Sequence, residues 1–178
     1  MTDMLELVVP TMAYKEQVMA YKGEMLANHD RFEGCNGLGK VETYEEWLDF
    51  RGREEKKGRS PSHTWLAVRQ SDGRVVGIIN CRSVLTEFLL QYGGHIGYCI
   101  RPSERRKGYA KEMLHLALEK YREAGEKKVL VTCDKSNLGS QRTILANGGI
   151  LENEVEDTVG LGETGIIQRY WITIEETQ

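Results

Sequence analysis

The 178-residue chain lacks the features that mark several protein classes. It contains no apolar run near the roughly 18 residues that a membrane span needs, so we expect no contact with a membrane. Its beginning, MTDMLELVVP, lacks the basic stretch and the small-residue cleavage site of a secretory signal. The net charge of −3 argues against a general nucleic-acid binder, which needs a positive surface. We therefore expect a cytoplasmic protein with no nucleic-acid partner.

Cysteine and proline are scarce, with four and three residues, and the cysteines form no CxxC pair. No His and Cys residues have the spacing of a zinc site, so we expect reduced thiols and no metal. An apolar fraction of 40% with a charged fraction of 29% excludes a disordered chain. A chain of this length buries enough surface to fold without disulfides, and no change in composition divides it. We predict a single domain over residues 1–178.

Apolar periodicity predicts a strand at residues 5–9 and a helix after it. The helix repeats its apolar residues every three or four positions, at Tyr14, Val18, Tyr21 and Met25. Thr43 and Glu46 form a capping box, because each side chain can accept a hydrogen bond from the other residue's free amide. A second helix therefore begins there, and we expect it to end near Gly58, because glycine suits a helix terminus.

The second half of the chain predicts a mixed sheet. Asp72-Gly73 between two apolar runs is typical of an antiparallel hairpin. A strand at 95–100, a helix at 109–124 and a strand at 129–131 require a parallel pair with a right-handed crossover. A short helix and two strands follow, at residues 138–147, 150–155 and 166–174. We predict an α/β fold with a mixed sheet of six to seven strands and helices on both faces. We take the exposed final strand as a candidate edge for a homodimer.

The clearest chemical signal lies where the strand at 95–100 gives way to the helix at 109–124. The connecting turn contains three consecutive basic residues and a glycine, which are Arg105, Arg106, Lys107 and Gly108. The first amides of a helix have no internal partners and lie at the positive end of its dipole. Gly108 has no Cβ, so a ligand oxygen can approach the backbone closely. The junction therefore predicts a phosphate or pyrophosphate site, and a solvated basic turn is the alternative.

Two motifs together resemble the GNAT family of N-acetyltransferases. Arg105-x-x-Gly108-x-Ala110 after a strand is similar to the family's signature, in which this loop binds the pyrophosphate of acetyl-coenzyme A. Asn137, Ser140 and the glycine-containing turn at 147–149 are similar to a second family segment, Asn-x-x-Ala/Ser. The order of the predicted elements matches the family over nearly the whole chain.

The resemblance implies acetyl-coenzyme A (acetyl-CoA) as co-substrate. The backbone of residues 106–111 would hold the pyrophosphate, and residues 98–100 would pair through their backbones with the pantetheine arm, as if it were an added strand. Asn137 and Ser140 would bond the coenzyme, or else they cap a helix. The residues implied to bind the coenzyme are Tyr98, Cys99, Ile100, Arg105, Arg106, Lys107, Gly108, Tyr109, Ala110, Lys111, Asn137 and Ser140.

The chain departs from the family at the positions of the acid and the base. Ile144 stands where many members have a tyrosine that protonates the leaving thiolate. Gly93-Gly94-His95 stands where many members have a carboxylate. His95 is therefore the candidate base, because an ordinary pKa of about 6.5 suits proton transfer near neutrality, and Glu87 is the second candidate. The alternatives are a structural histidine and a solvated glutamate.

We predict an N-acetyltransferase that moves an acetyl group to a primary amine of a small molecule or peptide, by direct transfer in a ternary complex. A non-catalytic module that binds or senses acyl-CoA is the alternative, and an interaction domain whose basic turn binds nothing is the third. Acidic side chains near the expected acceptor pocket would attract a cationic amine, or serve solubility alone. They are Glu33, Glu42, Glu45, Glu152, Glu154, Glu156, Asp157 and Glu163.

Overall fold

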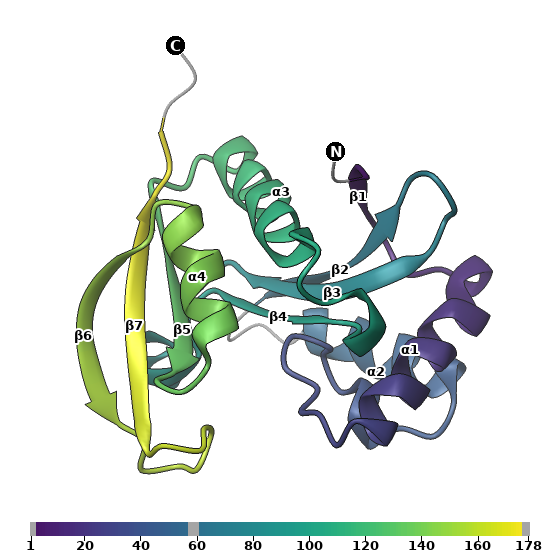
Figure 1. Cartoon of the computed structure of the whole chain (residues 1–178), viewed down its shortest axis with the longest axis horizontal. Helices are drawn as coiled ribbons and strands as arrows, with labels where there is room; N and C mark the ends of the chain where they lie inside the picture. The colour runs from purple at the N-terminus through teal and green to yellow at the C-terminus, as the bar shows by residue number, and fades with distance from the viewer. Residues whose placement is uncertain (1–2, 57–60, 176–178) are drawn as a thin grey trace.

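A seven-stranded mixed sheet runs through the middle of the molecule (Figure 1). The computed structural model describes residues 3–56 and 61–175. The strands lie in the order β1-β2-β3-β4-β5-β7-β6, and all neighbouring pairs are antiparallel except β4 and β5. The strands are β1 (Leu5–Val8), β2 (Ser62–Arg69), β3 (Val75–Arg82), β4 (Ile96–Ile100), β5 (Lys128–Asp134), β6 (Ile150–Glu156) and β7 (Ile166–Thr173). The predicted α/β fold with a mixed sheet is confirmed.

Helices cover both faces of this sheet, as predicted (Figure 1). One face carries α1 and α2, and α3 and α4 lie on the other side. The helices are α1 (Lys15–Ala27), α2 (Tyr44–Lys56), α3 (Tyr109–Glu123) and α4 (Leu138–Ala146). Within residues 3–56 and 61–175, none of them combines the length and the apolar character that crossing a membrane requires.

Strand β3 contributes to a hydrophobic core on each side of the sheet. Val76 and Ile79 belong to the cluster under α3, whereas Val75 and Ile78 belong to the cluster under α1 and α2. All four side chains are fully buried. An almost continuous apolar strand is expected where helices cover both faces, because neither face can be polar.

The local signals in the sequence form the contacts that they predict. The Glu46 amide donates to Thr43 Oγ1 at 3.2 Å, and the Thr43 amide donates to Glu46 Oε2 at 3.1 Å, which is the capping box. Gly73 turns the β2–β3 hairpin with a φ of 70°, in the left-handed region that favours glycine. The expected helix end near Gly58 lies outside the described residues.

The two central strands separate soon after they meet. The ladder between β4 and β5 contains one pair in the described chain, Ile96 with Val131. Beyond it β4 continues along β3, and β5 continues along β7 (Figure 1). The sheet therefore opens between β4 and β5, on the side where α3 begins and α4 lies.

The final hairpin corrects one prediction. The last strand, β7, is hydrogen-bonded to β5 on one side and to β6 on the other, so it is not an exposed edge. The edge strand is β6, whose residues are mostly exposed and include Glu152, Glu154 and Glu156. Carboxylates on an edge strand oppose pairing with another chain, so the homodimer proposed from this strand loses its basis.

Candidate functional site

A cleft of about 1080 Å³ lies where β4 and β5 separate, and we call it the large cleft. Its walls come from the loop between α1 and α2, the end of β4, the start of α3, α4 and the β6–β7 loop. Of the twelve residues that the family resemblance assigned to coenzyme binding, the wall includes all except Lys107. They are Tyr98, Cys99, Ile100, Arg105, Arg106, Gly108, Tyr109, Ala110, Lys111, Asn137 and Ser140.

The start of α3 presents a row of free amides to the large cleft. The first backbone bond of this helix runs from the Glu112 amide to Gly108 O at 3.2 Å, and no side chain caps Gly108. Within the described chain, the amides of residues 106–111 donate no hydrogen bond. Arg106 and Gly108 both adopt left-handed backbone angles, with φ of 61° and 85°. Such a turn before a helix start forms a concave site for an anion.

The basic side chains of this turn are tied to the protein. Arg105 Nε donates to Ile100 O at 2.9 Å, and its guanidinium pairs with Asp30 at 3.0 Å. Lys107 Nζ pairs with the buried carboxylate of Glu104 at 2.9 Å. Lys107 therefore fixes the turn from outside the large cleft, instead of adding a charge inside it as predicted. The backbone amides and Arg106 are left to meet an anion.

The free edge of β4 supplies a second row of backbone groups. The Arg101 amide donates to Val76 O of β3 at 2.8 Å. Because backbone direction alternates along a strand, the amides of Tyr98 and Ile100 point the other way, toward the gap beside β5. An extended ligand in the gap can pair with this edge as an additional strand.

Tyr98 reaches across the gap to α4. Its hydroxyl lies 2.8 Å from Ser140 Oγ, and Asn137 Oδ1 accepts a hydrogen bond from the Ser140 amide at 3.0 Å. Asn137 is therefore the N-cap of α4, which is the alternative that the sequence left open. Burial raises the pKa of the Tyr98 phenol, so it stays protonated. Ile144 is fully buried and has no hydroxyl, whereas the Tyr98 phenol lies on the wall of the large cleft and contacts α4 through Ser140.

His95 lies in the protein core and not on the wall of the large cleft. Its Nδ1 accepts a hydrogen bond from the Leu130 amide at 2.8 Å, and its ring packs edge-on against Tyr121 and Trp171. Burial, together with repulsion from Arg82, lowers its pKa to about 4. The neutral ring carries its proton on Nε2, so no free lone pair faces a substrate. The geometry gives His95 a structural role in joining β4 to β5.

The buried, neutral His95 should make the protein less stable in acid. The unfolded chain binds a proton with a pKa of about 6.5, whereas the folded chain resists it down to about 4. Stability is therefore lost as pH falls, by about 2 kcal/mol at about pH 5. We expect His95→Asn to remove this loss, and His115→Asn, on the exposed face of α3, to leave it. Urea unfolding at neutral pH and at about pH 5 measures the loss of stability. If His95→Asn loses as much stability between the two pH values as the unaltered protein does, the assignment is contradicted.

Glu87, the second candidate base, lies in the connection before the π-helical turn at Leu89–Gly93. Its side chain is exposed and is not part of the wall of the large cleft. The position offers no route for a proton from a ligand in that cleft. The sequence suggested Glu87 because it lies shortly before β4 along the chain. In the structure this short separation does not place its side chain at the gap between β4 and β5.

Among the carboxylates that line the large cleft, Asp134 and Glu33 have different surroundings. Burial acts against the charge of Asp134, but hydrogen bonds from Ser136 and Thr164 outweigh it and lower the pKa to about 2. Burial raises the pKa of Glu33, the nearby charge of Arg31 opposes the rise, and repulsion from Asp134 adds to it. Glu33 is open to solvent within the cleft, yet protein atoms around it remove enough water to disfavour its charge. Asp134 is thus a structural anchor, and Glu33 is free to take a proton.

A tight crossing of two chain segments holds Glu33 at the opening. Gly34 has a φ of 69°, and a Cβ there would lie 2.1 Å from Gly97 O of β4. Only glycine fits this crossing, so the loop after Glu33 rests directly on the strand. The Cys35 thiol donates to Glu33 O at 3.6 Å and secures the same turn. Sequence reasoning missed this role, because Glu33 is more than 60 positions from β4 and lies in a loop without periodicity.

Three of the eight side chains in the expected acidic rim form ion pairs within the protein. Glu154 pairs with Lys135 at 3.0 Å, and Glu45 and Glu152 pair with Lys15 and Arg169. Asp157 accepts hydrogen bonds from the amides of its own loop. The three ion pairs reduce the attraction that the rim can exert on a cationic amine.

Comparison with known proteins fits this geometry. No curated protein matches the sequence. Solved structures do: a microcin C7 self-immunity acetyltransferase in complex with acetyl-CoA and AMP has a TM-score of 0.72 at 16% identity, covering 97% of this chain and 93% of that one. An acetyl transferase from Salmonella typhimurium, described as modifying the N-terminal serine of ribosomal protein L7/L12, has a TM-score of 0.70 at 17% identity. The match covers 96% of this chain and 95% of that one. An acetyltransferase of the GNAT family from Streptococcus pneumoniae has a TM-score of 0.69 at 17% identity, and the match covers 97% of this chain and 100% of that one.

At these identities the solved structures show a common fold. The family is shown by the sequence model of the acetyltransferase (GNAT) domain, which matches residues 6–150, most of the chain. The chain belongs to the GNAT family of acetyltransferases.

Proposed function

We propose that the protein transfers the acetyl group of acetyl-CoA to a primary amine of a small molecule or peptide, directly and within a ternary complex. The observation that carries the proposal is the row of free amides at residues 106–111, which lies beside the gap between β4 and β5. A diphosphate matches the amides, and an extended amide-containing arm matches the strand edge. The two features lie on one cleft, as one ligand with both parts requires.

Different residues of the chain would bind different parts of acetyl-CoA. The amides of residues 106–111 bind the pyrophosphate, and Arg106 lies beside it. The β4 edge at Tyr98 and Ile100 pairs with the pantetheine arm and fixes the thioester. A β4 amide near the thioester also stabilises the negative charge that develops on its carbonyl oxygen. Holding both reactants in line accounts for much of the rate, because a thioester is already activated.

Glu33 is the base in this proposal, in place of His95 and Glu87. An alkylammonium has an ordinary pKa of about 10.4, so it must lose a proton before its nitrogen can attack. Glu33 lies on the wall of the large cleft, and burial raises its pKa toward the value that a base near neutrality needs. The proton passes from the ammonium to the Glu33 carboxylate, directly or through one water molecule.

The Tyr98–Ser140 pair is the acid in this proposal. Tyr98 stays protonated, and its hydroxyl lies 2.8 Å from Ser140 Oγ at the gap. When the C–S bond breaks, the pair donates a proton to the leaving thiolate, and it regains one from the nitrogen, which loses its second proton as the amide forms. Ser140 orients the phenol. A thiol with an ordinary pKa of about 8.5 leaves without full protonation, so the assistance is moderate.

Tyr98→Phe should lower kcat about 10-fold, because proton donation helps only moderately when the leaving group is a thiolate. KM for acetyl-CoA should change less than about 2-fold, because the backbone of β4 and not the phenol binds the arm. Steady-state assays of released thiol against pH measure both. Tyr92→Phe is the matched control, since the Tyr92 hydroxyl bonds Thr158 outside the large cleft. An unchanged kcat in Tyr98→Phe would remove the acid role.

The function itself is tested by binding and by turnover. Calorimetry with acetyl-CoA should show a single site, and a screen of primary amines should find one that gains the mass of an acetyl group. Binding without turnover of any amine would favour the alternative, a module that senses acyl-CoA. Absence of binding at millimolar acetyl-CoA would refute both.

A further inference from the structure

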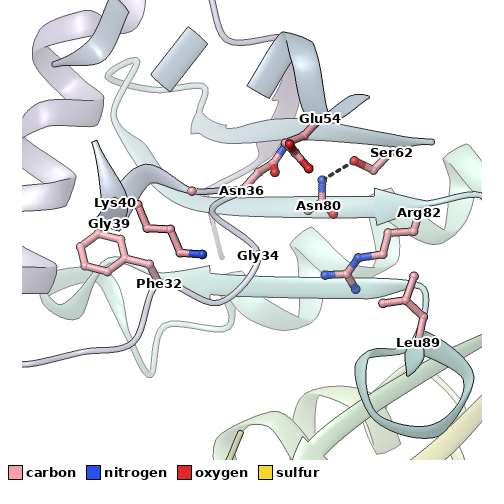
Figure 2. A pocket seen from close by; sticks show the side chains of 11 residues that line it. Phe32, Gly34, Asn36, Gly39, Lys40, Glu54, Ser62, Asn80, Arg82 and Leu89 are labelled. Atoms are coloured by element: carbon pink, nitrogen blue, oxygen red, sulfur yellow. Dashed lines mark hydrogen bonds between the residues drawn. The ribbon is translucent and has the colours of Figure 1, made fainter. Parts of the chain in front are cut away.

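A second cavity lies on the face of the sheet that carries α1 and α2 (Figure 2). Its volume is about 360 Å³, and we call it the small pocket. The α1–α2 loop covers it, and β2 and β3 form its floor. The side chains that matter here are Lys40, Glu54, Ser62, Asn80 and Arg82. None of them belongs to the wall of the large cleft.

The floor of the small pocket is polar although it lies against the core. Asn80 is 5% exposed, and its amide nitrogen donates to Ser62 Oγ and Thr64 Oγ1 at 3.1 Å each. Asn80 and Arg82 are two positions apart on β3, so both side chains point to the same face of the sheet. Figure 2 shows them side by side at the base of the pocket, with Lys40 reaching in from the loop. The two hydrogen bonds satisfy the Asn80 amide nitrogen and fix a polar floor that a polar ligand can contact.

Arg82 carries a charge that no carboxylate balances among the described residues. Its Nη1 donates to Gly93 O and Gly94 O, at 3.2 Å and 3.1 Å. The ion pairs of residues 3–56 and 61–175 do not include Arg82. Burial lowers its pKa, which measures how poorly the charge is solvated. Lys40 adds a second positive charge, so the small pocket has two cations and one carboxylate, Glu54.

One loop segment lines both the small pocket and the large cleft. Gly34 lines the small pocket, and its neighbour Glu33 lines the large cleft. The backbone of Gly34 packs on Gly97 of β4, and Arg82 Nη2 lies beside this crossing, 3.6 Å from the point that a Cβ of Gly97 would occupy. Arg82 and Glu33 therefore lie near the same crossing, on different cavities.

We infer that the small pocket binds the acceptor, and that the acceptor is a small amine that also carries an anionic group, either a carboxylate or a phosphate. The inference rests on the proposed function and names the class of its acceptor. The anion lies against Arg82 and Asn80, and the amine extends along the α1–α2 loop toward Glu33 and the thioester. The volume of about 360 Å³ suits one small molecule and leaves little room for a peptide.

The chemistry of the small pocket differs from that of a site for polyamines. The half-buried guanidinium of Arg82 repels a second ammonium group, whereas an anion restores the balance of charge. A pocket built to pair with a charged group discriminates strongly against the neutral analogue, because the buried charge is then left unpaired. The charge of the group distant from the amine should therefore decide which amines bind.

The test measures binding of N-acetylated products, so it does not depend on turnover. Calorimetry compares N-acetylglycine with N-acetylglycinamide, and N-acetylethanolamine phosphate with N-acetylethanolamine. We expect the anionic member of at least one pair to bind at least about 10-fold more tightly to the unaltered protein. The pair that shows the difference distinguishes a carboxylate from a phosphate. Equal affinities within both pairs would overturn the inference.

Two variants remove the unbalanced positive charge of Arg82 in different ways. Arg82→Gln deletes the cation, and Asn80→Asp keeps Arg82 and its bonds to Gly93 and Gly94 but neutralises it from a neighbouring position. Both should reduce the preference to less than about 3-fold. Arg53→Gln, which removes an exposed cation paired with Asp49, should keep it. A preference that survives in both pocket variants would overturn the inference.

Acetyl-CoA binding, measured on the same samples, separates the two proposals. Each variant should bind acetyl-CoA as the unaltered protein does, which also shows that it is folded. Loss of the anion preference with intact acetyl-CoA binding supports the acceptor class. If the unaltered protein fails to bind acetyl-CoA, the proposed function is refuted, and the acceptor role of the small pocket is refuted with it.

Discussion

Gly108→Glu should weaken the binding of acetyl-CoA about 1000-fold, because a carboxylate placed against a diphosphate costs several kcal/mol. Gly108 precedes the first residue of α3, and its neighbours present the free amides. A side chain there fills the space that a ligand oxygen needs, and its negative charge opposes the dipole-assisted site for an anion. Calorimetry with acetyl-CoA measures the loss directly.

The backbone strain of this substitution needs its own control. Gly108 has a φ of 85°, and a residue with a Cβ pays about 1–2 kcal/mol in that conformation. Gly125, at the other end of α3, has a φ of 82° and open space around it. Gly125→Glu therefore carries similar strain and the same charge but lies away from the cleft. It should lower the melting temperature to a similar degree and leave the affinity for acetyl-CoA unchanged. Equal affinities in the two variants would refute the site.

The row of free amides before α3 was predictable from the sequence because its parts are consecutive. A strand, a turn with Gly108 and the start of α3 place the free amides together without help from the rest of the fold. The capping box at Thr43 and the Asp72-Gly73 hairpin are local in the same way, and both form as expected. Such features depend on a few neighbouring residues, and tertiary packing has little to add to them.

The groups proposed for catalysis depend on contacts between distant segments, and sequence patterns do not contain those contacts. The sequence favours His95 as a base, but the amide of Leu130, 35 positions away, donates to its Nδ1. In the sequence Glu33 is one of many charged residues, and the crossing of Gly34 over Gly97 places it at the opening. Nothing in the sequence around Gly34 or Gly97 indicates that these two residues pack against each other.

The order of the last two strands was within reach of the sequence. The residues of β7 include the apolar Ile167, Tyr170 and Ile172, all buried, whereas β6 is rich in glutamate. A strand with an apolar stripe belongs inside a sheet, and a charged strand belongs at its edge. This comparison of composition predicts that β7 inserts between β5 and β6, which simple sequential pairing does not.

Glu33→Gln should lower kcat about 100-fold, because removing a general base costs from about 10² to 10⁴ in rate. Glutamine keeps the size and the hydrogen-bonding capacity of the side chain but cannot accept a proton. In the unaltered enzyme, kcat should fall as pH drops through the raised pKa of Glu33, since the protonated acid is inactive. The variant should lose this acid limb, and its remaining rate should follow the free amine.

The control for this prediction is Glu163→Gln, because Glu163 also lines the large cleft but lies on the β6–β7 loop. It removes the same charge from the same cavity without removing a group held against β4. Its kcat should stay within about 2-fold of the unaltered enzyme, a difference of less than about 0.5 kcal/mol in the barrier. KM for acetyl-CoA should be unchanged in both variants, since neither carboxylate faces the free amides of α3. Equal losses of kcat would show that general electrostatics of the cleft, and not a proton acceptor at Glu33, sets the rate. If Glu33→Gln lowers kcat by the expected factor but leaves its pH profile unchanged, Glu33 positions the substrate and takes no proton.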